Sequence, residues 1–279
     1  MYWSKADDIS VPLVAKQMPR NKFIAMKKYV HVADNENLTK GDKMAKVRPL
    51  IDAVNESLQQ FGIFHKELSI DEQMVPYYGR HSCKMFLRGK PIRFGYKLWL
   101  LCSSTGYPFN IDVYCGKNSE KSDVPLGTKV VKKMLQCVNN PSCHDNFFIS
   151  YDFLMELRDM DFHATGTVRE VRLKKCTLEE IPNTDKIPQG KFDYKSDRNI
   201  LIVKWKDSKV VCVASSHDTV NPMLPTKRFS QSQKKYIQIP QPAMIRSYNQ
   251  YMDSGDLLDR FISQYRPVIT SKTWYCQLL

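Results

Sequence analysis

The chain has 279 residues, of which 42% are hydrophobic and 25% are charged, a balance typical of a globular domain and not of a disordered chain. Its 42 Lys and Arg outnumber its 29 Asp and Glu, which gives a formal net charge of +13. This excess predicts an anionic partner, most commonly nucleic acid, although a basic surface without a partner is the simpler alternative. No run of about eighteen apolar residues occurs and the first eight residues have no apolar core, so we expect neither a membrane span nor a secretory leader.

The cysteines are scattered singly along the sequence. None of them forms a C-x-x-C pair, so neither a structural zinc site nor a disulfide framework is indicated. We therefore expect reduced thiols and an intracellular protein. The eight positions are Cys83, Cys102, Cys115, Cys137, Cys143, Cys176, Cys212 and Cys276.

Residues 1–66 have helical character. Apolar residues recur at helical spacing after Pro19, residues 34–37 (DNEN) are typical of a loop, and Arg48-Pro49 opens another helix because proline is tolerated at a first helical position. Two helices do not form a domain alone, so we expect this segment to belong to a DNA-binding and dimerisation region. The apolar residues that share one face of the later helix are Leu50, Val54, Leu58 and Phe61.

Residues 67–169 change to strand-like alternation. Asp71 lies on a first expected strand, and residues 91–102 and 107–114 form a second and a third, joined by a turn that contains Gly106. Helices are expected around Val130 and Leu154, with a further strand at 162–168. This order predicts an α/β fold in which a ribonuclease-H-like mixed sheet is flanked by helices.

Residues 170–242 differ from the expected core, because short β stretches at 191–194, 200–205 and 210–214 alternate with proline-marked loops. We interpret them as a small β-rich insertion that follows the first part of the core, 67–169. Residues 243–270 are helical again and would close the core, which leaves 271–279 as a truncated tail.

Three acids are the candidates for catalysis. Asp71, Asp145 and Asp256 are far apart in sequence. A ribonuclease-H-like core would nevertheless bring together an acid on the first strand, an acid at the end of the neighbouring strand and an acid on the closing helix. Carboxylates are ligands that Mg²⁺ or Mn²⁺ prefers, and two such ions can activate water and stabilise the leaving oxygen of a phosphodiester. Each acid also has a structural alternative: Asp71 as a turn or cap residue, Asp145 as a helix N-cap, and Asp256 as part of a solvated helix face.

The motifs around these acids occur in a recognisable order. SIDEQM at 69–74 and GKPIRFGYK at 89–97 are followed by DNFF at 145–148, GTVR at 166–169 and YNQYM at 248–252. Together, over about residues 18–270, they resemble the piggyBac family of DNA transposases and its domesticated descendants.

This resemblance implies a DDE/D-type core with an insertion before the final helix. It implies metal-dependent cleavage of transposon ends by water, hairpin formation on those ends and joining at TTAA targets, with Mg²⁺ (or Mn²⁺) and no small-molecule cofactor. It further implies a homodimer on double-stranded DNA, in the nucleus. By position, Asp71, Asp145 and Asp256 match the catalytic, metal-binding acids, and Asp259 matches a nearby acid that also binds metal.

Two segments depart from the family pattern. The family has Met-Gly-Gly-Val-Asp before its third acid, whereas this chain has Met252-Asp253-Ser254-Gly255-Asp256, which adds a charge. The strand before the second acid is normally apolar, whereas residues 139–144 read NNPSCH, and proline is a poor strand residue.

Basic residues interleaved with aromatic ones are candidates for contacts with DNA phosphates, and a solvated strand edge protected by lysines is the alternative. Two functions follow: a transposase that cleaves and joins DNA, or a catalytically inactive DNA- or chromatin-binding protein derived from one. A gene remnant without a stable fold is a third reading. The candidate DNA-binding residues are Arg80, Lys84, Arg88, Lys90, Arg93 and Arg169.

Overall fold

The computed structural model describes most of the chain. The described residues are 2–6, 10–63, 66–116, 124–138, 149–169, 172–173, 176, 178–182, 187–197, 199–231, 233–266 and 274–278. Asp145, its motif at 145–148 and the preceding residues 139–144 lie outside this set.

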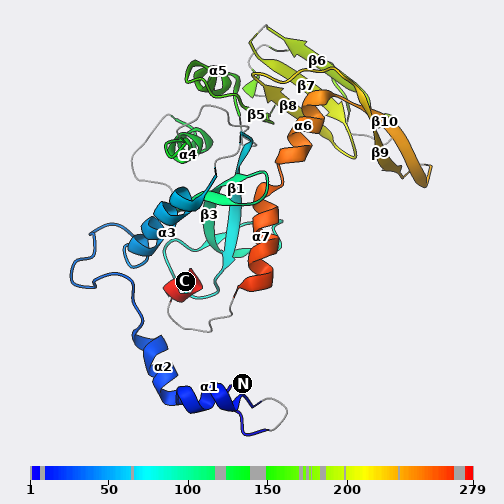
Figure 1. Ribbon diagram of the computed structural model, residues 1–279. Helices are drawn as coiled ribbons and strands as arrows, with labels where there is room; N and C mark the ends of the chain where they lie inside the picture. Colours follow the sequence, from blue (N-terminus) through cyan, green and yellow to red (C-terminus); the bar gives the residue numbers. More distant parts are fainter. Residues whose placement is uncertain are drawn as a thin grey trace.

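An antiparallel sheet forms the centre of the molecule (Figure 1). β1 (Leu68–Pro76) pairs along its whole length with β3 (Phe94–Ser103), and β3 also pairs with β4 (Pro108–Val113) and with the short β2 (Met85–Phe86). The turn between β3 and β4 contains Gly106, whose φ of 84° is in the left-handed region that favours glycine. The expected meander of three strands is therefore confirmed.

Helices cover both faces of this sheet. On one face, α4 (Leu126–Leu135) and α5 (Tyr151–Asp159) enclose the larger apolar core. On the other face, α7 (Ser254–Tyr265) lies against β1 and β3, and its Leu258 belongs to a second apolar core. Because side chains alternate along a strand, Ile70 points into the first core, whereas Asp71 and Val75 are on the α7 face.

A second sheet contains β5 (Thr165–Thr167), β8 (Val210–Ser215), β7 (Leu201–Lys206) and β6 (Phe192–Ser196), in this spatial order. Its first strand, β5, was expected to end the core, and the other three were expected to form the insertion. Hydrogen bonds between β5 and β8 join the two parts, so the sheet runs across the expected boundary at 169/170. The division of the chain into domains stays a prediction.

Two further strands and a helix complete this half of the molecule. β9 (Leu224–Ser230) and β10 (Lys235–Gln241) form a separate two-stranded ribbon. α6 (Ala243–Tyr251) contacts β5 and β8 and supplies Met244 and Ile245 to a third apolar core. Within the described residues, the helical stretch expected at 243–270 is therefore two helices, interrupted at Met252 and Asp253.

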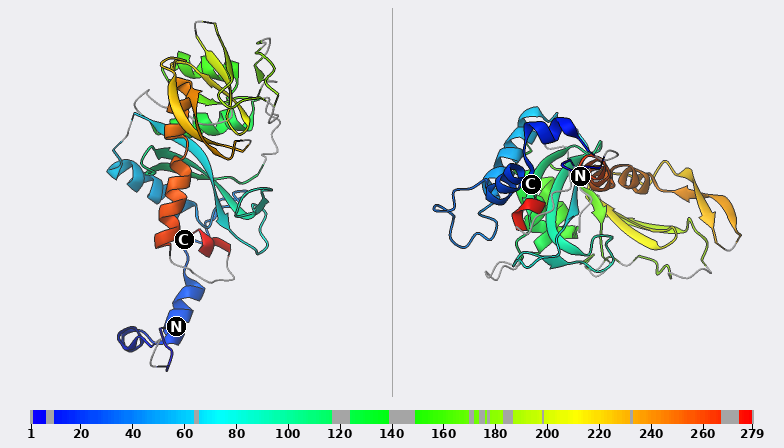
Figure 2. Two further views of the ribbon diagram at one scale, coloured as in Figure 1. Left: turned by 90° about the vertical axis from the view of Figure 1, so that its right-hand side faces the viewer. Right: turned by 90° about the horizontal axis from the view of Figure 1, so that it is seen from below.

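The N-terminal segment is helical, as the spacing predicted. α1 (Pro12–Gln17) and α2 (Arg20–Tyr29) contain no buried residue and extend away from the body of the molecule (Figure 2). α3 (Arg48–Phe61) lies along β4, and the fully buried Met44 and Val47 anchor the chain just before it. None of the helices in the described ranges is long and apolar enough to cross a membrane.

Candidate active site

β1 and the first turn of α7 bring two of the predicted acids together. Asp71 lies mid-strand on β1, and a Cβ added to Gly255 would be only 2.6 Å from its Oδ2. The helix backbone one residue before Asp256 therefore lies directly against the Asp71 carboxylate. Asp256 is solvent-exposed in the first turn of α7, and its charge acts on Asp71.

The Asp71 carboxyl is held in a partly buried and electrostatically mixed environment. Burial is the largest influence and raises the pKa of Asp71 to about 6. The Glu72 backbone N–H, which donates to Oδ1 at 2.7 Å, and Lys90 act in the opposite direction, while Asp256 and Glu72 raise the pKa further. Carboxylates crowded in this way favour a cation between them or a shared proton.

Asp259 follows one helical turn after Asp256 and is half-buried. It accepts a hydrogen bond from the Gln73 side chain on β1. Burial raises the pKa of Asp259, the Gln73 hydrogen bond lowers it, and the nearby Asp256 raises it. Gln73 shares the strand face of Asp71, so Asp71 and Asp259 lie on the same side of the sheet. Burial raises the pKa of the Cys102 thiol on β3, and both acids raise it further.

Two lysines pair with Glu72, the residue that follows Asp71 on β1. Lys97 Nζ lies 2.5 Å from Glu72 Oε2 and 3.8 Å from the centre of the Trp99 ring, and Lys90 Nζ lies 3.4 Å from Glu72 Oε1. Burial raises the pKa of Glu72, but the two lysines together hold it below its usual value. Sequence reasoning did not single out Glu72, Gln73 or Lys97, although their places beside Asp71 and on the paired strand were visible signals.

The predicted DNA-contacting residues divide into two groups. Lys84, Arg88, Lys90 and Arg93 flank or belong to the β2–β3 hairpin, and Arg80 lies in the segment that leads into it. Lys90 acts electrostatically on both Asp71 and Asp259, so this hairpin borders the acids. Arg169 follows β5, in the second sheet, and is exposed.

The second predicted acid, Asp145, lies outside the described residues. Within the described ranges, no group of three or more His, Cys, Asp or Glu side chains is arranged to hold a metal ion. The donors at hand, Asp71, Asp256 and Asp259, are all carboxylates, the ligand type that fits Mg²⁺ or Mn²⁺ and not a soft metal. Burial is the main cause of the raised pKa of Asp71, and the charge of Asp256 on α7 adds to it.

A mixed α/β core with acids on a sheet strand and on a helix against it fits the ribonuclease-H-like fold class. Comparisons with known proteins found matches over nearly the whole chain. A family model described as Transposase IS4 matches residues 1–279. A solved structure of a piggyBac transposase synaptic complex with hairpin DNA matches with a TM-score of 0.78 and 26% identity, covering 97% of this chain and 56% of that chain. This likeness confirms the expected fold class.

Two human proteins are similar over nearly the whole chain. PiggyBac transposable element-derived protein 3 is 39% identical over 284 residues, which covers 99% of this chain and 48% of that protein. PiggyBac transposable element-derived protein 2 is 32% identical over 289 residues, covering 100% of this chain and 49% of that protein. This chain belongs to the piggyBac family of transposases and transposase-derived proteins. It spans about half the length of the curated relatives it matches.

Proposed function

We propose that this chain is the catalytic part of a piggyBac-type transposase and cleaves and joins DNA strands with the help of divalent metal ions. The observation that carries the proposal is the contact between the middle of β1 and the first turn of α7, which places Asp71 against Gly255 and within electrostatic reach of Asp256. An aspartate with only a structural role on a solvated face would stay in water. Placing Asp71 against α7 costs folding free energy, and such an aspartate would avoid that cost.

Asp71 and Asp256 would hold the metal ions, with Asp259 beside them and Asp145 completing the set. Transposases of the DDE class generally use divalent metal ions, which activate water and stabilise the leaving oxygen of a phosphodiester. Gln73 orients Asp259 through its hydrogen bond, and the Glu72–Lys97 pair fixes the strand next to Asp71. Lys90, at the hairpin tip, is placed to attract a phosphate toward the acids.

The partner in this proposal is double-stranded DNA, handled by two copies of the chain in the nucleus. The net charge of +13 and the basic β2–β3 hairpin beside the acids support a DNA partner. Hairpin ends, which the matched synaptic complex contains, and the TTAA targets that the family resemblance implies are the substrates to test first.

The decisive experiment measures metal binding and strand cleavage on the same variants. Mn²⁺ should raise the melting temperature of the wild-type chain, and the chain should open a DNA hairpin with TTAA at its tip in Mg²⁺ or Mn²⁺. Asp71→Asn and Asp256→Asn should lose the Mn²⁺ stabilisation and lower cleavage by at least about 100-fold, the scale on which loss of one electrostatic contributor acts.

Asp253→Asn is the matched control, because Asp253 is an exposed carboxylate three residues before Asp256 that is not among the proposed ligands. It should keep both the Mn²⁺ effect and cleavage. A wild-type chain that melts cooperatively but neither binds Mn²⁺ nor cuts would overturn the catalytic proposal, and DNA binding that survives Asp71→Asn would then favour the inactive, DNA-binding alternative.

A further inference from the structure

The ribbon of β9 and β10 stands apart from both four-stranded sheets. Figure 1 shows it at the edge of the molecule opposite α3, and the second panel of Figure 2 places it at the same extremity. The strands pair antiparallel with Phe229 opposite Tyr236, Lys227 opposite Gln238 and Pro225 opposite Pro240. Since side chains alternate along a strand, these six residues share one face of the ribbon.

The opposite face attaches the ribbon to the second sheet. Ile239 is 3% exposed and packs in the third apolar core. Arg228 Nε lies 3.1 Å from both carboxylate oxygens of Asp207, and the Trp205 indole N–H donates to the Pro240 carbonyl at 3.0 Å. The ribbon is therefore held in place by its inner face and by Pro240, which lies against Gly190, whereas Lys227, Phe229 and Tyr236 of the outer face are exposed.

The outer face is aromatic and exposed. Phe229 is 43% exposed and Tyr236 is 64% exposed, and their rings meet edge to face with centroids 5.4 Å apart. Lys227 Nζ lies 4.9 Å from the centre of the Tyr236 ring. Aromatic rings beside lysines on a solvent-facing strand pair are typical of surfaces that contact nucleic acid.

The ribbon also carries a one-sided charge. No Asp or Glu occurs between Asp218 and Asp253, while five Lys and Arg occur there. Lys227, Lys234 and Lys235 are exposed, and within the described part of the chain none of them lies within ion-pair distance of a carboxylate. Among the described residues, no carboxylate therefore competes with a polyanion for these lysines.

We infer that the outer face of the β9–β10 ribbon is a DNA-docking surface, separate from the acids, in which Lys227 on that face and Lys234 at the ribbon tip bind phosphates and Tyr236 and Phe229 pack on the duplex. A two-stranded antiparallel ribbon has dimensions that the major groove of B-DNA admits. Phosphate contacts position the duplex and carry no sequence preference. The inference rests on the proposed function only in that the partner is DNA.

The competing explanation is that lysines protect the two open edges of the ribbon from pairing with other chains. It predicts that these lysines affect aggregation and leave DNA affinity unchanged.

The experiment measures binding of a fluorescent 30-base-pair duplex by anisotropy in EDTA, over a series of salt concentrations. EDTA separates docking from metal-dependent cleavage. The double variant Lys227→Gln/Lys234→Gln should weaken binding several-fold and reduce the slope of log affinity against log salt by up to about 2, since each lost phosphate contact removes roughly 0.9. Tyr236→Ala should also weaken binding, with Tyr236→Phe close to wild type.

The matched control is Lys46→Gln/Lys129→Gln, which removes the same charge from two exposed lysines outside the ribbon. It should leave the salt slope unchanged, and circular dichroism melts should show that all variants are folded. An equal loss in both double variants, or no loss in the ribbon variant, would overturn the inference. Asp71→Asn should bind the duplex as wild type does, so a failure of cleavage and a failure of docking are separate results.

Discussion

At Gly255, α7 approaches β1 so closely that no side chain fits between them. A Cβ there would lie 2.6 Å from Asp71 Oδ2 and 2.8 Å from Asp71 Cβ, and the latter atom is fixed to the strand backbone. We expect Gly255→Ala to lower the free energy of unfolding by about 1–3 kcal/mol, the usual cost of overpacking, even though Ala favours helix. Urea denaturation measures this difference.

Ser263→Ala is the control for that measurement, because Ser263 is exposed on the same helix. It should change the unfolding free energy by no more than about 0.5 kcal/mol. If Gly255→Ala proved as stable as wild type, the close contact between helix and strand would be wrong.

The pH dependence of stability is a second prediction for a single residue. The pKa of Asp71, raised by burial to about 6, lies above the value near 3.9 of an unfolded aspartate. Ionisation between these values favours the unfolded chain, so this group lowers stability as the pH rises through about 4 to 6. Asp71→Asn, which cannot ionise, should be more stable than wild type at about pH 7, by up to about 3 kcal/mol.

The measurement is denaturant unfolding of both proteins in EDTA at several pH values. The difference should disappear near pH 4, where Asp71 is protonated in the folded chain. A constant difference across this range would show that the Asn substitution acts through packing and not through charge.

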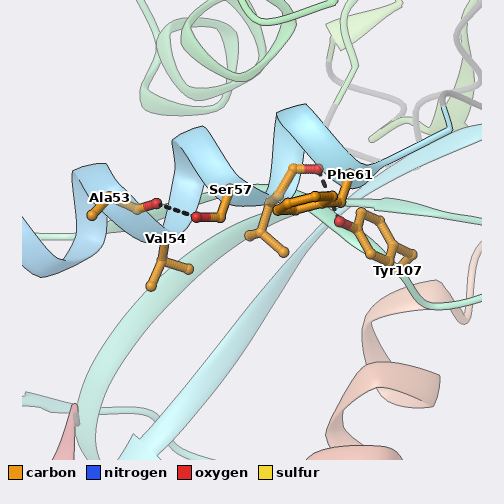
Figure 3. Close-up of a pocket in the computed structure, with 6 residues that line it drawn as sticks. Ala53, Val54, Ser57, Phe61 and Tyr107 are labelled. Carbon is orange, nitrogen blue, oxygen red and sulfur yellow. Dashed lines mark hydrogen bonds between the residues drawn. The ribbon is translucent and has the colours of Figure 1, made fainter.

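At the scale of elements, α3 is attached to the sheet by polar contacts. Its Asn55 donates to the Ile111 carbonyl at 2.9 Å and accepts from the Ile111 N–H at 2.8 Å, which caps a stretch of β4, while Tyr107 donates to the Leu58 carbonyl. The apolar face of α3 that the sequence predicted is partly exposed to solvent, since Phe61 is 74% exposed. Phe61 lines a shallow cavity of about 320 Å³ together with Val54 and Tyr107 (Figure 3).

Asn55→Ala should therefore destabilise the chain by about 1–3 kcal/mol, because it leaves the Ile111 backbone groups without their partner. Gln59→Ala, an exposed position on the same helix, should be neutral. Hydrogen exchange is the more specific measurement. The Ile111 amide should lose protection in Asn55→Ala and keep it in Gln59→Ala. Unchanged protection there would contradict the capping role.

At the scale of the whole molecule, the two halves share one apolar core. Ile200, Ile202 and Ala214 of the second half pack in the same cluster as Leu68 and Trp99 of the central sheet. The insertion is therefore expected to unfold together with the core. Strand pairing of β5 with β8 leads to the same expectation.

Ile202→Ala tests this coupling. It should lower the unfolding free energy by about 2–5 kcal/mol while keeping a single transition that circular dichroism and tryptophan fluorescence report at the same midpoint. Tyr194→Ala, at an exposed position of β6, should have a small effect. Two separated transitions in Ile202→Ala would show that the insertion folds independently.

Local patterns were enough to place many of the elements. Alternation around Asp71 and the glycine turn at Gly106 predicted the meander, and proline at the first turn predicted the start of α3, because these signals act between neighbours in sequence. The same patterns could not predict that the helical stretch at 243–270 breaks at Met252, or that Phe61 is turned to solvent, since both depend on what the helix packs against.

The sequence by itself determined the family, the fold class and the identities of Asp71, Asp256 and Asp259 as candidate acids, because motif order and strand alternation are written in consecutive residues. Only the tertiary structure decided that Gly255 seats α7 on Asp71, that Gln73 holds Asp259 and that Lys97 pairs with Glu72. It also decided that one face of the β9–β10 ribbon is exposed while the other is packed. Such contacts join residues far apart in the chain, and their energies depend on burial, which no local pattern specifies.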